Sequence, residues 1–173
     1  FKVYIWVCNA AFNNGKVDIF SKEHNEKAIM DVMMANVAGP FLTIKNFYEN
    51  LNINHGAKIA IISSLMGSQQ HSSSNAPIYR ASKAAANNLM RTISNQFIND
   101  NVIVASYHPG WVRTDMGGSH ADISPEESAE GLMKQFLNLN PNARISILGL
   151  AYKENTHSIY DAQGTQERKG PDG

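Results

Sequence analysis

The chain has 173 residues, of which 15 are lysine or arginine and 15 are aspartate or glutamate. This length is enough for one domain with a sizeable core, and the balanced charge gives no sign of a nucleic-acid or anionic membrane partner. No apolar run approaches the ~20 residues that a membrane-spanning helix needs. A single cysteine, Cys8, excludes an internal disulfide framework and favours a reducing, cytoplasmic compartment. The six histidines show no HxH or HxxxH spacing, so we expect no metal site.

Four short apolar segments, rich in β-branched and aromatic residues, are typical of buried strands. They span 2–8, 57–64, 102–108 and 145–151. Helical patterns lie between them at 24–51, 77–98 and 125–139. Near-continuous apolar strands that alternate with helices predict a parallel sheet covered on both faces. The predicted fold class is therefore α/β, a doubly wound Rossmann-like sheet in one domain over 1–151. The polar residues 152–173 are expected to form a loose tail.

Local signals mark the ends and one interruption of the helices. Pro77 suits a first helical turn, with Asn75 as a candidate cap, and the Ser-Pro-Glu-Glu run at 124–127 is a good helix start. Within 24–51, Pro40 should interrupt the helical hydrogen bonds, because it cannot donate and crowds the carbonyl of residue 36.

Small and polar residues follow three of the predicted strands. The first strand continues into NAAFNNG, the second ends on Ser63-Ser64, and the third continues into PGWVRTDMGG. In doubly wound sheets, ligands bind beyond the carboxyl ends of the strands. We therefore expect the functional site at this edge of the sheet.

The helix 77–98 carries Tyr79 and Lys83 four residues apart, on one face. A free phenol has a pKa of about 10, which is too high for a base near neutrality, and a neighbouring positive charge favours the phenolate. Tyr79 could then exchange a proton with a substrate oxygen. Taken alone, the pair is equally typical of an ordinary tyrosine beside a solvated lysine.

Five motifs in a fixed order distinguish these interpretations. They are NAA after the first strand, NVAG at 36–39, ISS at 62–64, YRASK at 79–83 and PGWVRTDM at 109–116. Together they resemble the short-chain dehydrogenase/reductase family, and YRASKAA with HPGWVRTDMGG is most similar to its C-factor and sniffer-like carbonyl reductase branch. The resemblance runs from residue 2 to about 151. It implies an oxidoreductase that transfers a hydride between NAD(P), with NADP favoured, and a small carbonyl or alcohol.

Carried over residue by residue, the resemblance assigns four catalytic side chains. Tyr79 is the acid or base, and Lys83 lowers its pKa and holds the nicotinamide ribose. Ser64 hydrogen-bonds the reacting carbonyl, a bond that strengthens as the oxygen gains charge. Ser64 is preferred to Ser63 by the resemblance and by the alternation of faces along the strand, and Ser63 is the candidate for capping the turn. Asn36 supports a water that leads to Lys83, although an asparagine merely tolerated at a kink is a serious alternative.

The same edge is expected to hold the nicotinamide side of the cofactor. The resemblance places the nicotinamide amide against the backbone of Val112 and the hydroxyl of Thr114. The remaining expected cofactor contacts are Asn9, Ala10, Tyr79, Lys83, Pro109 and Gly110. The motif CNAA at 8–11 matches the family's Asn-Asn-Ala-Gly only in part. Cys8 ends a buried strand and is not expected to be a nucleophile.

The glycine-rich turn that brings backbone N–H groups onto a dinucleotide pyrophosphate does not occur in the 173 residues. By resemblance, this turn and the residues that select NAD or NADP would precede Phe1, within about 60 further residues. The chain is thus expected to be the catalytic, C-terminal part of an N-terminally truncated domain. We expect strand 2–8 to form an uncovered sheet edge that causes self-association, and we expect the 173 residues alone to bind NAD(P) poorly.

One function from another class competes with the enzyme. A non-catalytic signalling or interaction protein on the same fold would suit the altered CNAA motif. The intact set of four catalytic candidates favours the enzyme. The sequence does not identify the substrate, because specificity lies in variable loops.

The resemblance also implies self-assembly. Relatives pair through the helices that correspond to 24–51 and 77–98, so we expect a homodimer or homotetramer. Ala84, Ala85 and Ala86 would offer a strip of small residues for close helix approach.

Overall fold

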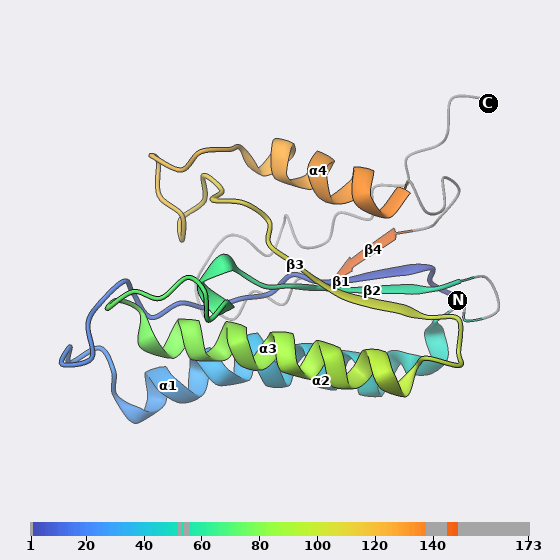
Figure 1. Ribbon diagram of the computed structural model, residues 1–173, viewed down its shortest axis with the longest axis horizontal. Helices are drawn as coiled ribbons and strands as arrows, with labels where there is room; N and C mark the ends of the chain where they lie inside the picture. The colour runs from blue at the N-terminus through green and yellow to red at the C-terminus, as the bar shows by residue number, and fades with distance from the viewer. Residues whose placement is uncertain (1, 52, 54–55, 138–144, 149–173) are drawn as a thin grey trace.

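Figure 1 shows the computed structural model of the chain, which describes residues 2–51, 53, 56–137 and 145–148. In chain order, the elements are β1 (Ile5–Cys8), α1 (Glu26–Met33), a π-helical turn (Met34–Ala38), α2 (Gly39–Phe47), a 3-10 turn (Tyr48–Asn50), β2 (Lys58–Ile62), a second 3-10 turn (Leu65–Gly67), α3 (Pro77–Gln96), β3 (Ile103–Tyr107), α4 (Pro125–Leu137) and β4 (Ile145–Leu148). The predicted alternation of strands and helices is confirmed.

The four strands form one parallel sheet in the order β3-β2-β1-β4. On one side of β1, Ile5 lies opposite Lys58 of β2, and on the other side Ile5 lies opposite Ile145 of β4. The expectation that β1 forms an uncovered edge is therefore wrong for this structure, because β4 satisfies its second row of backbone groups. The premise for self-association through β1 is removed with it.

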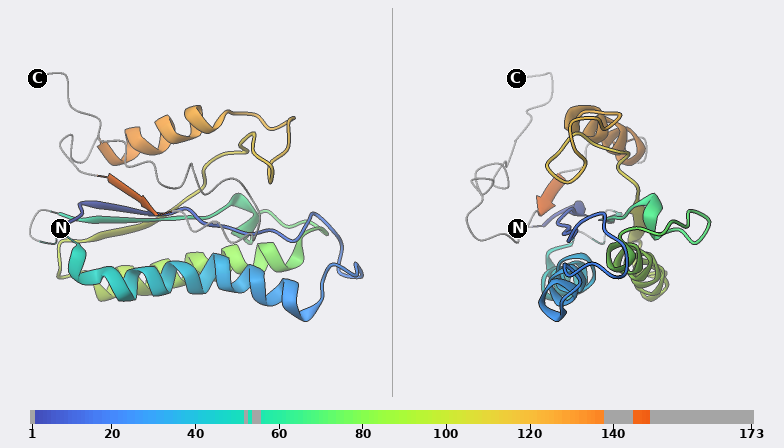
Figure 2. Two further views of the ribbon diagram at one scale, coloured as in Figure 1. Left: turned by 180° about the vertical axis from the view of Figure 1, so that it is seen from behind. Right: turned by 90° about the vertical axis from the view of Figure 1, so that its left-hand side faces the viewer.

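Helices cover both faces of the sheet (Figure 2). α1, α2 and α3 lie against one face and α4 lies on the other. Side chains alternate accordingly along β1. Trp6 and Cys8 belong to the larger apolar cluster, which includes Ile44 of α2 and Ile93 of α3. Val7 belongs to the smaller cluster, with which Leu132 of α4 packs. The predicted doubly wound α/β fold class is confirmed.

The predicted helix 24–51 is divided at the place expected from Pro40. α1 ends at Met33, five residues form a π-helical turn, and α2 starts at Gly39 with Pro40 in its first turn. Pro40 has no N–H to offer the carbonyl of Asn36, and the N–H of Gly39 bonds to the carbonyl of Met34, five residues back. Such single π-turns are frequent at functional sites. This one carries Asn36, which is only 1% exposed.

The two predicted helix starts have different outcomes. α3 begins at Pro77 as expected, but Asn75 does not cap it. The residue before the helix is Ala76, with a left-handed φ of 50° and no side-chain cap. Asn75 instead accepts two hydrogen bonds from Arg80, through its carbonyl (2.8 Å) and its Oδ1 (3.2 Å). At α4 the cap is confirmed, because Ser124 Oγ accepts from the N–H of Glu127 at 3.1 Å.

The alanine strip expected on α3 is only partly available for contact with another molecule. Ala86 is fully buried in the larger apolar cluster. A side chain on Gly67 would meet the backbone nitrogen of Ala84 at 2.9 Å, so this part of α3 packs within the domain. The expectation that all three alanines face a partner is therefore wrong for Ala86.

Some expectations fall outside the described residues. These are the tail 152–173, the last residues of the helix 125–139, and the last residues of the strand 145–151. Within the described ranges, no helix is long and apolar enough to cross a membrane. In the same ranges, no three His, Cys, Asp or Glu side chains are grouped so that they could hold a metal ion.

Candidate active site

The predicted site residues follow strands that end at one edge of the parallel sheet (Figure 1). Ser64 lies two residues beyond β2 and Pro109 lies two residues beyond β3, while Asn9 directly follows β1. The first half of α3 contributes Tyr79 and Lys83. The topology therefore brings segments from four separate parts of the chain to one place.

Tyr79 and Ser64 form the centre of the candidate site. Tyr79 is 7% exposed, and burial raises the pKa of its phenol above the ordinary value, while a hydrogen bond with Ser64 acts in the opposite direction. Ser64 Oγ also accepts from the N–H of Met66 at 3.1 Å and so caps the 3-10 turn. Ser63 Oγ instead donates to the carbonyl of Lys83 at 3.4 Å. The preference for Ser64 agrees with this geometry, but the expectation that Ser63 caps the turn is wrong.

Lys83 is held one helical turn behind Tyr79. Its Nζ donates to the carbonyl of Ile62 at 2.9 Å and lies 5.5 Å from the centroid of the Tyr79 ring. Burial lowers the pKa of Lys83 to about 8, so its ammonium is still the main form at neutral pH. For the Tyr79 phenol, burial is the largest influence and raises the pKa, so the lowering expected from Lys83 stays a prediction. Near neutrality, Tyr79 therefore carries its phenolic proton.

Asn36 uses its whole side chain in structural hydrogen bonds. Its Oδ1 accepts from the N–H of Phe12 at 2.7 Å, and its Nδ2 donates to the carbonyl of Phe12 at 2.9 Å and to Ser82 Oγ at 2.8 Å. Ser82 Oγ in turn donates to the carbonyl of Tyr79 at 2.8 Å. Asn36 thus joins the loop after β1 to the helix that carries Tyr79.

Two residues near the centre were missed from the sequence. Ser82 is fully buried. The only indication of its role in the sequence was its position, as a small polar residue between Tyr79 and Lys83 in YRASK. Gly67 allows the 3-10 turn to lie directly on α3, because a Cβ there would come within 2.7 Å of the Lys83 carbonyl carbon. The only indication of this role in the sequence was the presence of a glycine three residues beyond Ser64.

His108 was also not singled out. Its Nδ1 accepts from the N–H of Leu65 at 3.4 Å, which places the ring beside the residue that follows Ser64. Burial and the neighbouring His71 lower the pKa of His108, consistent with a neutral ring that can accept a hydrogen bond. Cys8 is buried, and burial raises the pKa of its thiol to about 11, so it stays protonated near neutrality.

The loop after β3 contains the expected nicotinamide contacts. Gly110 has a left-handed φ of 88°, and a Cβ there would lie 2.5 Å from Cδ1 of Ile123. Val112 forms an isolated β-bridge with Ile123. Thr114 is exposed, and its Oγ1 accepts from the N–H of Gly117 at 3.1 Å. These residues lie together on one loop, as expected.

The residues present fit the nicotinamide end of a dinucleotide better than its phosphates. A phenol, a buried ammonium and the turn that needs Gly110 lie at the edge where such ligands bind. Asn9 is exposed and Ala10 half-buried after β1. The sequence provides no glycine-rich turn for a pyrophosphate.

The sheet order, the crossing helices and the site at the carboxyl ends of the strands define a Rossmann-like α/β protein with a candidate active site. A family model described as short chain dehydrogenase matches residues 2–124, so the chain belongs to the short-chain dehydrogenase family. The predicted family is confirmed.

Two curated relatives illustrate the range of this family. The chain is 40% identical over 111 residues to 1-hydroxy-2-glutathionyl-2-methyl-3-butene dehydrogenase of Rhodococcus sp. (strain AD45), covering 61% of this chain and 48% of that protein. It is 30% identical over 132 residues to C-signal of Myxococcus xanthus, covering 76% of this chain and 72% of that protein. The chain therefore spans about half the length of the first relative.

Solved structures show the same fold. Carbonyl reductase Sniffer of D. melanogaster superposes with a TM-score of 0.75 at 23% identity, over 86% of this chain and 64% of that one. A short-chain dehydrogenase/reductase from Burkholderia multivorans with bound NADP gives 0.71 at 28% identity, over the same shares of the two chains. The expected likeness to C-factor and sniffer-like proteins agrees with these relatives.

Proposed function

We propose that the chain is the catalytic part of an NADP- or NAD-dependent oxidoreductase that interconverts a small carbonyl compound and its alcohol. The observation that carries the proposal is the buried Tyr79, hydrogen-bonded to Ser64 and backed by Lys83 one turn along α3. An ordinary surface tyrosine beside a solvated lysine would not be 7% exposed, nor would its lysine be 1% exposed. Buried titratable groups with shifted pKa values at a strand edge are typical of active sites.

In the direction of reduction, the side chains have distinct tasks. Ser64 would donate to the carbonyl oxygen of the substrate and orient it. Tyr79 would give its phenolic proton to that oxygen as negative charge develops there. The ammonium of Lys83 would stabilise the phenolate that remains. The bound nicotinamide would supply the hydride in this direction and accept it in the other.

Lys83 and the loop after β3 would also hold the cofactor. We propose that Lys83 and Tyr79 contact the nicotinamide ribose and that Val112 and Thr114 contact the nicotinamide amide. The remaining proposed cofactor contacts are Asn9, Ala10, Pro109 and Gly110. The relative from Burkholderia multivorans with bound NADP supports NADP as the cofactor.

Asn36 would serve the site in two ways. Its side chain fixes the loop after β1 to α3, through Phe12 and Ser82. Its backbone carbonyl, which Pro40 cannot pair by an N–H, would support a water on the way to Lys83.

We further propose that the protein is cytoplasmic and self-associates through α1, α2 and α3. α1, α2 and the π-helical turn between them leave large apolar side chains exposed, from 42% to 64%. They are Met30, Met34, Phe41, Leu42 and Phe47. Apolar surface of this kind on a monomer suggests a protein contact.

The test measures carbonyl reduction by the complete gene product with a panel of small aldehydes and ketones. The reaction is monitored as the loss of NADPH absorbance. Tyr79→Phe should lower the rate by two to four orders of magnitude, because only the proton donor is removed. The affinity for NADPH should change far less than the rate, because the other proposed cofactor contacts remain. The matched control is Tyr48→Phe, whose ring stacks on Phe97 away from the candidate site.

A Tyr79→Phe variant that kept most of the wild-type rate would overturn the assignment. Absence of turnover and of nicotinamide binding in the wild-type protein would favour a non-catalytic signalling protein, a function in keeping with the relative named C-signal and with CNAA in place of Asn-Asn-Ala-Gly.

A further inference from the structure

The residues between β3 and α4 form a loop whose two arms are paired. The N–H of Arg113 donates to the carbonyl of Ile123 at 2.9 Å, and the N–H of Ile123 donates to the carbonyl of Trp111 at 3.1 Å. Trp111 Nε1 donates to the carbonyl of Gly117 at 2.8 Å, across the tip of the loop. A Cβ on Gly117 would overlap the carbonyl of Val112, so the tip is tightly closed.

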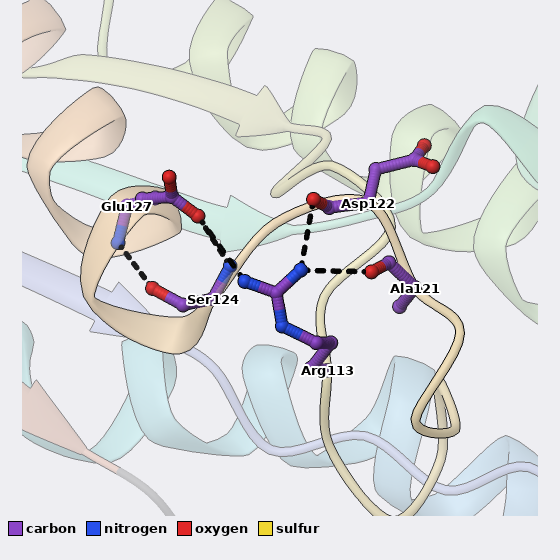
Figure 3. Close-up of polar contacts among 5 residues, drawn as sticks. All are labelled: Arg113, Ala121, Asp122, Ser124 and Glu127. Carbon is purple, nitrogen blue, oxygen red and sulfur yellow. Dashed lines mark hydrogen bonds and ion pairs between the residues drawn. The ribbon is translucent and has the colours of Figure 1, made fainter.

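The side chain of Arg113 spans the inside of this loop (Figure 3). Its Nη1 donates to the carbonyls of Ala121 and Asp122, both at 2.9 Å, and its Nη2 lies 3.5 Å from Oε2 of Glu127. The guanidinium presents donors in a fixed planar fork. Lysine has one donor atom in place of that fork and would not reach all three acceptors together.

The first turn of α4 anchors the same loop at both ends. Glu127 Oε2 accepts from the N–H of Ser124 at 2.6 Å as well as lying near Arg113. Ser128 Oγ donates to the carbonyl of Pro109 at 2.6 Å. The arm that begins at Pro109 and the arm that ends at Ser124 are therefore both tied to α4.

The two kinds of contact made by Arg113 differ in strength. The ion pair with Glu127 is long, and the side chains are 41% and 61% exposed, so solvent screens it. The two hydrogen bonds to carbonyls are short and charge-assisted, and Ala121 is 4% exposed. The carbonyl contacts should therefore dominate, and Glu127 should matter mainly as the cap of α4.

We infer that Arg113 is a positioning residue for cofactor binding: its guanidinium holds the loop 109–124 in the shape that presents Val112 and Thr114 before any cofactor arrives. The inference rests on the proposed function for the identity of the ligand. The contacts that shape the loop are intramolecular and can be tested without a ligand.

The first experiment measures the loop itself, without cofactor. Trp6 is 2% exposed and Trp111 is 44% exposed, and the sequence has no other tryptophan. Acrylamide quenching of the native protein thus reports mainly on Trp111. Arg113→Lys should increase the quenching constant and speed hydrogen exchange in the peptide 109–124. Arg91→Lys, an exposed position on α3, is the matched control and should change neither.

The second experiment measures NADPH. Arg113→Lys should raise the dissociation constant and the KM for NADPH by about tenfold, as expected for a misplaced binding loop, while the KM for the carbonyl substrate and the melting temperature change little. Glu127→Gln, which keeps an amide oxygen for the N–H of Ser124, should have a smaller effect. This ordering separates positioning from general stability.

Three outcomes decide the inference. Unchanged quenching and exchange in Arg113→Lys would show that Arg113 does not shape the loop. A loosened loop with unchanged NADPH affinity would show that the shape does not serve the cofactor. If the wild-type protein binds no nicotinamide, the proposed function and the role in cofactor binding both fail, whereas quenching and exchange still decide whether Arg113 orders the loop.

Discussion

Replacing Lys83 by methionine should remove a specific pH dependence of stability. The side chain is 1% exposed, and burial lowers the pKa of its ammonium from the ordinary 10.5 to about 8. Between these two values the unfolded chain binds the proton and the folded chain does not. The contribution of Lys83 to the free energy of unfolding therefore rises with pH through the window from about 8 to 10.5.

The size of this effect follows from the same two values. Their separation corresponds to ~3 kcal/mol, at about 1.4 kcal/mol for each tenfold change in a protonation equilibrium. Near pH 7, replacing the buried ammonium by methionine would raise the free energy of unfolding by that amount. The variant would also lose the hydrogen bond from Nζ to the carbonyl of Ile62, which contributes roughly 1.5–3 kcal/mol when the donor is charged. The two terms nearly cancel at neutral pH. The change with pH is thus the informative quantity.

Urea unfolding at pH 7, 8.5 and 10 measures it. Relative to Lys83→Met, the wild-type free energy of unfolding should increase by roughly 2.5 kcal/mol between pH 7 and pH 10. Cys8 titrates in both proteins and cancels in the difference. Lys45→Met, at an exposed position of α2, is the control, and its free energy of unfolding should change with pH in the same way as that of the wild type. A constant difference between wild type and Lys83→Met at all three pH values would refute the burial argument.

Three further predictions concern other buried positions. Gly67→Ala should lower the stability by about 1–3 kcal/mol in thermal unfolding, because its Cβ would come within 2.7 Å of the Lys83 backbone, and an unchanged melting temperature would mean that the 3-10 turn can move away. Ser82→Ala should lower the stability by about 1–3 kcal/mol in urea, because it leaves a donor of Asn36 unpaired in the interior; Ser→Ala at exposed Ser72 is the control. Cys8 should resist a disulfide-exchange reagent at pH 8 in the native protein and should react after unfolding in urea, because burial raises the pKa of its thiol to about 11. A rapid reaction in the native protein would contradict the burial of Cys8.

Hydrophobic periodicity and local chemistry were sufficient to predict most of the fold. The strand segments and the α4 cap depend on near neighbours in the chain, and so does the interruption at Pro40, where a missing N–H acts on the preceding turn. Such features are visible in a short window of sequence. The helix start at Pro77 was predicted correctly, but the cap by Asn75 was wrong, because Arg80 donates to the oxygen atoms of Asn75.

Contacts between distant segments were harder to predict. Nothing near β1 specifies that its second edge pairs with β4, more than a hundred residues later. The bond from Asn36 to Ser82 spans 46 residues, and the role of Gly67 depends on how closely α3 approaches. Tyr79 and Lys83 were found by spacing and resemblance. The sign of the Tyr79 pKa shift needed the burial of the phenol, which the sequence does not reveal.

The π-helical turn explains a pattern that a regular helix would not support. The buried residues of this segment recur at every fourth position, at Val32, Asn36, Pro40 and Ile44. In a straight α-helix each step of four residues drifts by about 40°, so the last would point about 120° away from the first. One additional residue in a turn takes up about 100° of this drift. The wide turn therefore acts as a phase correction that keeps a four-residue repeat on one side, whereas the same residues wound as one regular α-helix would leave Ile44 pointing about 120° away from Val32.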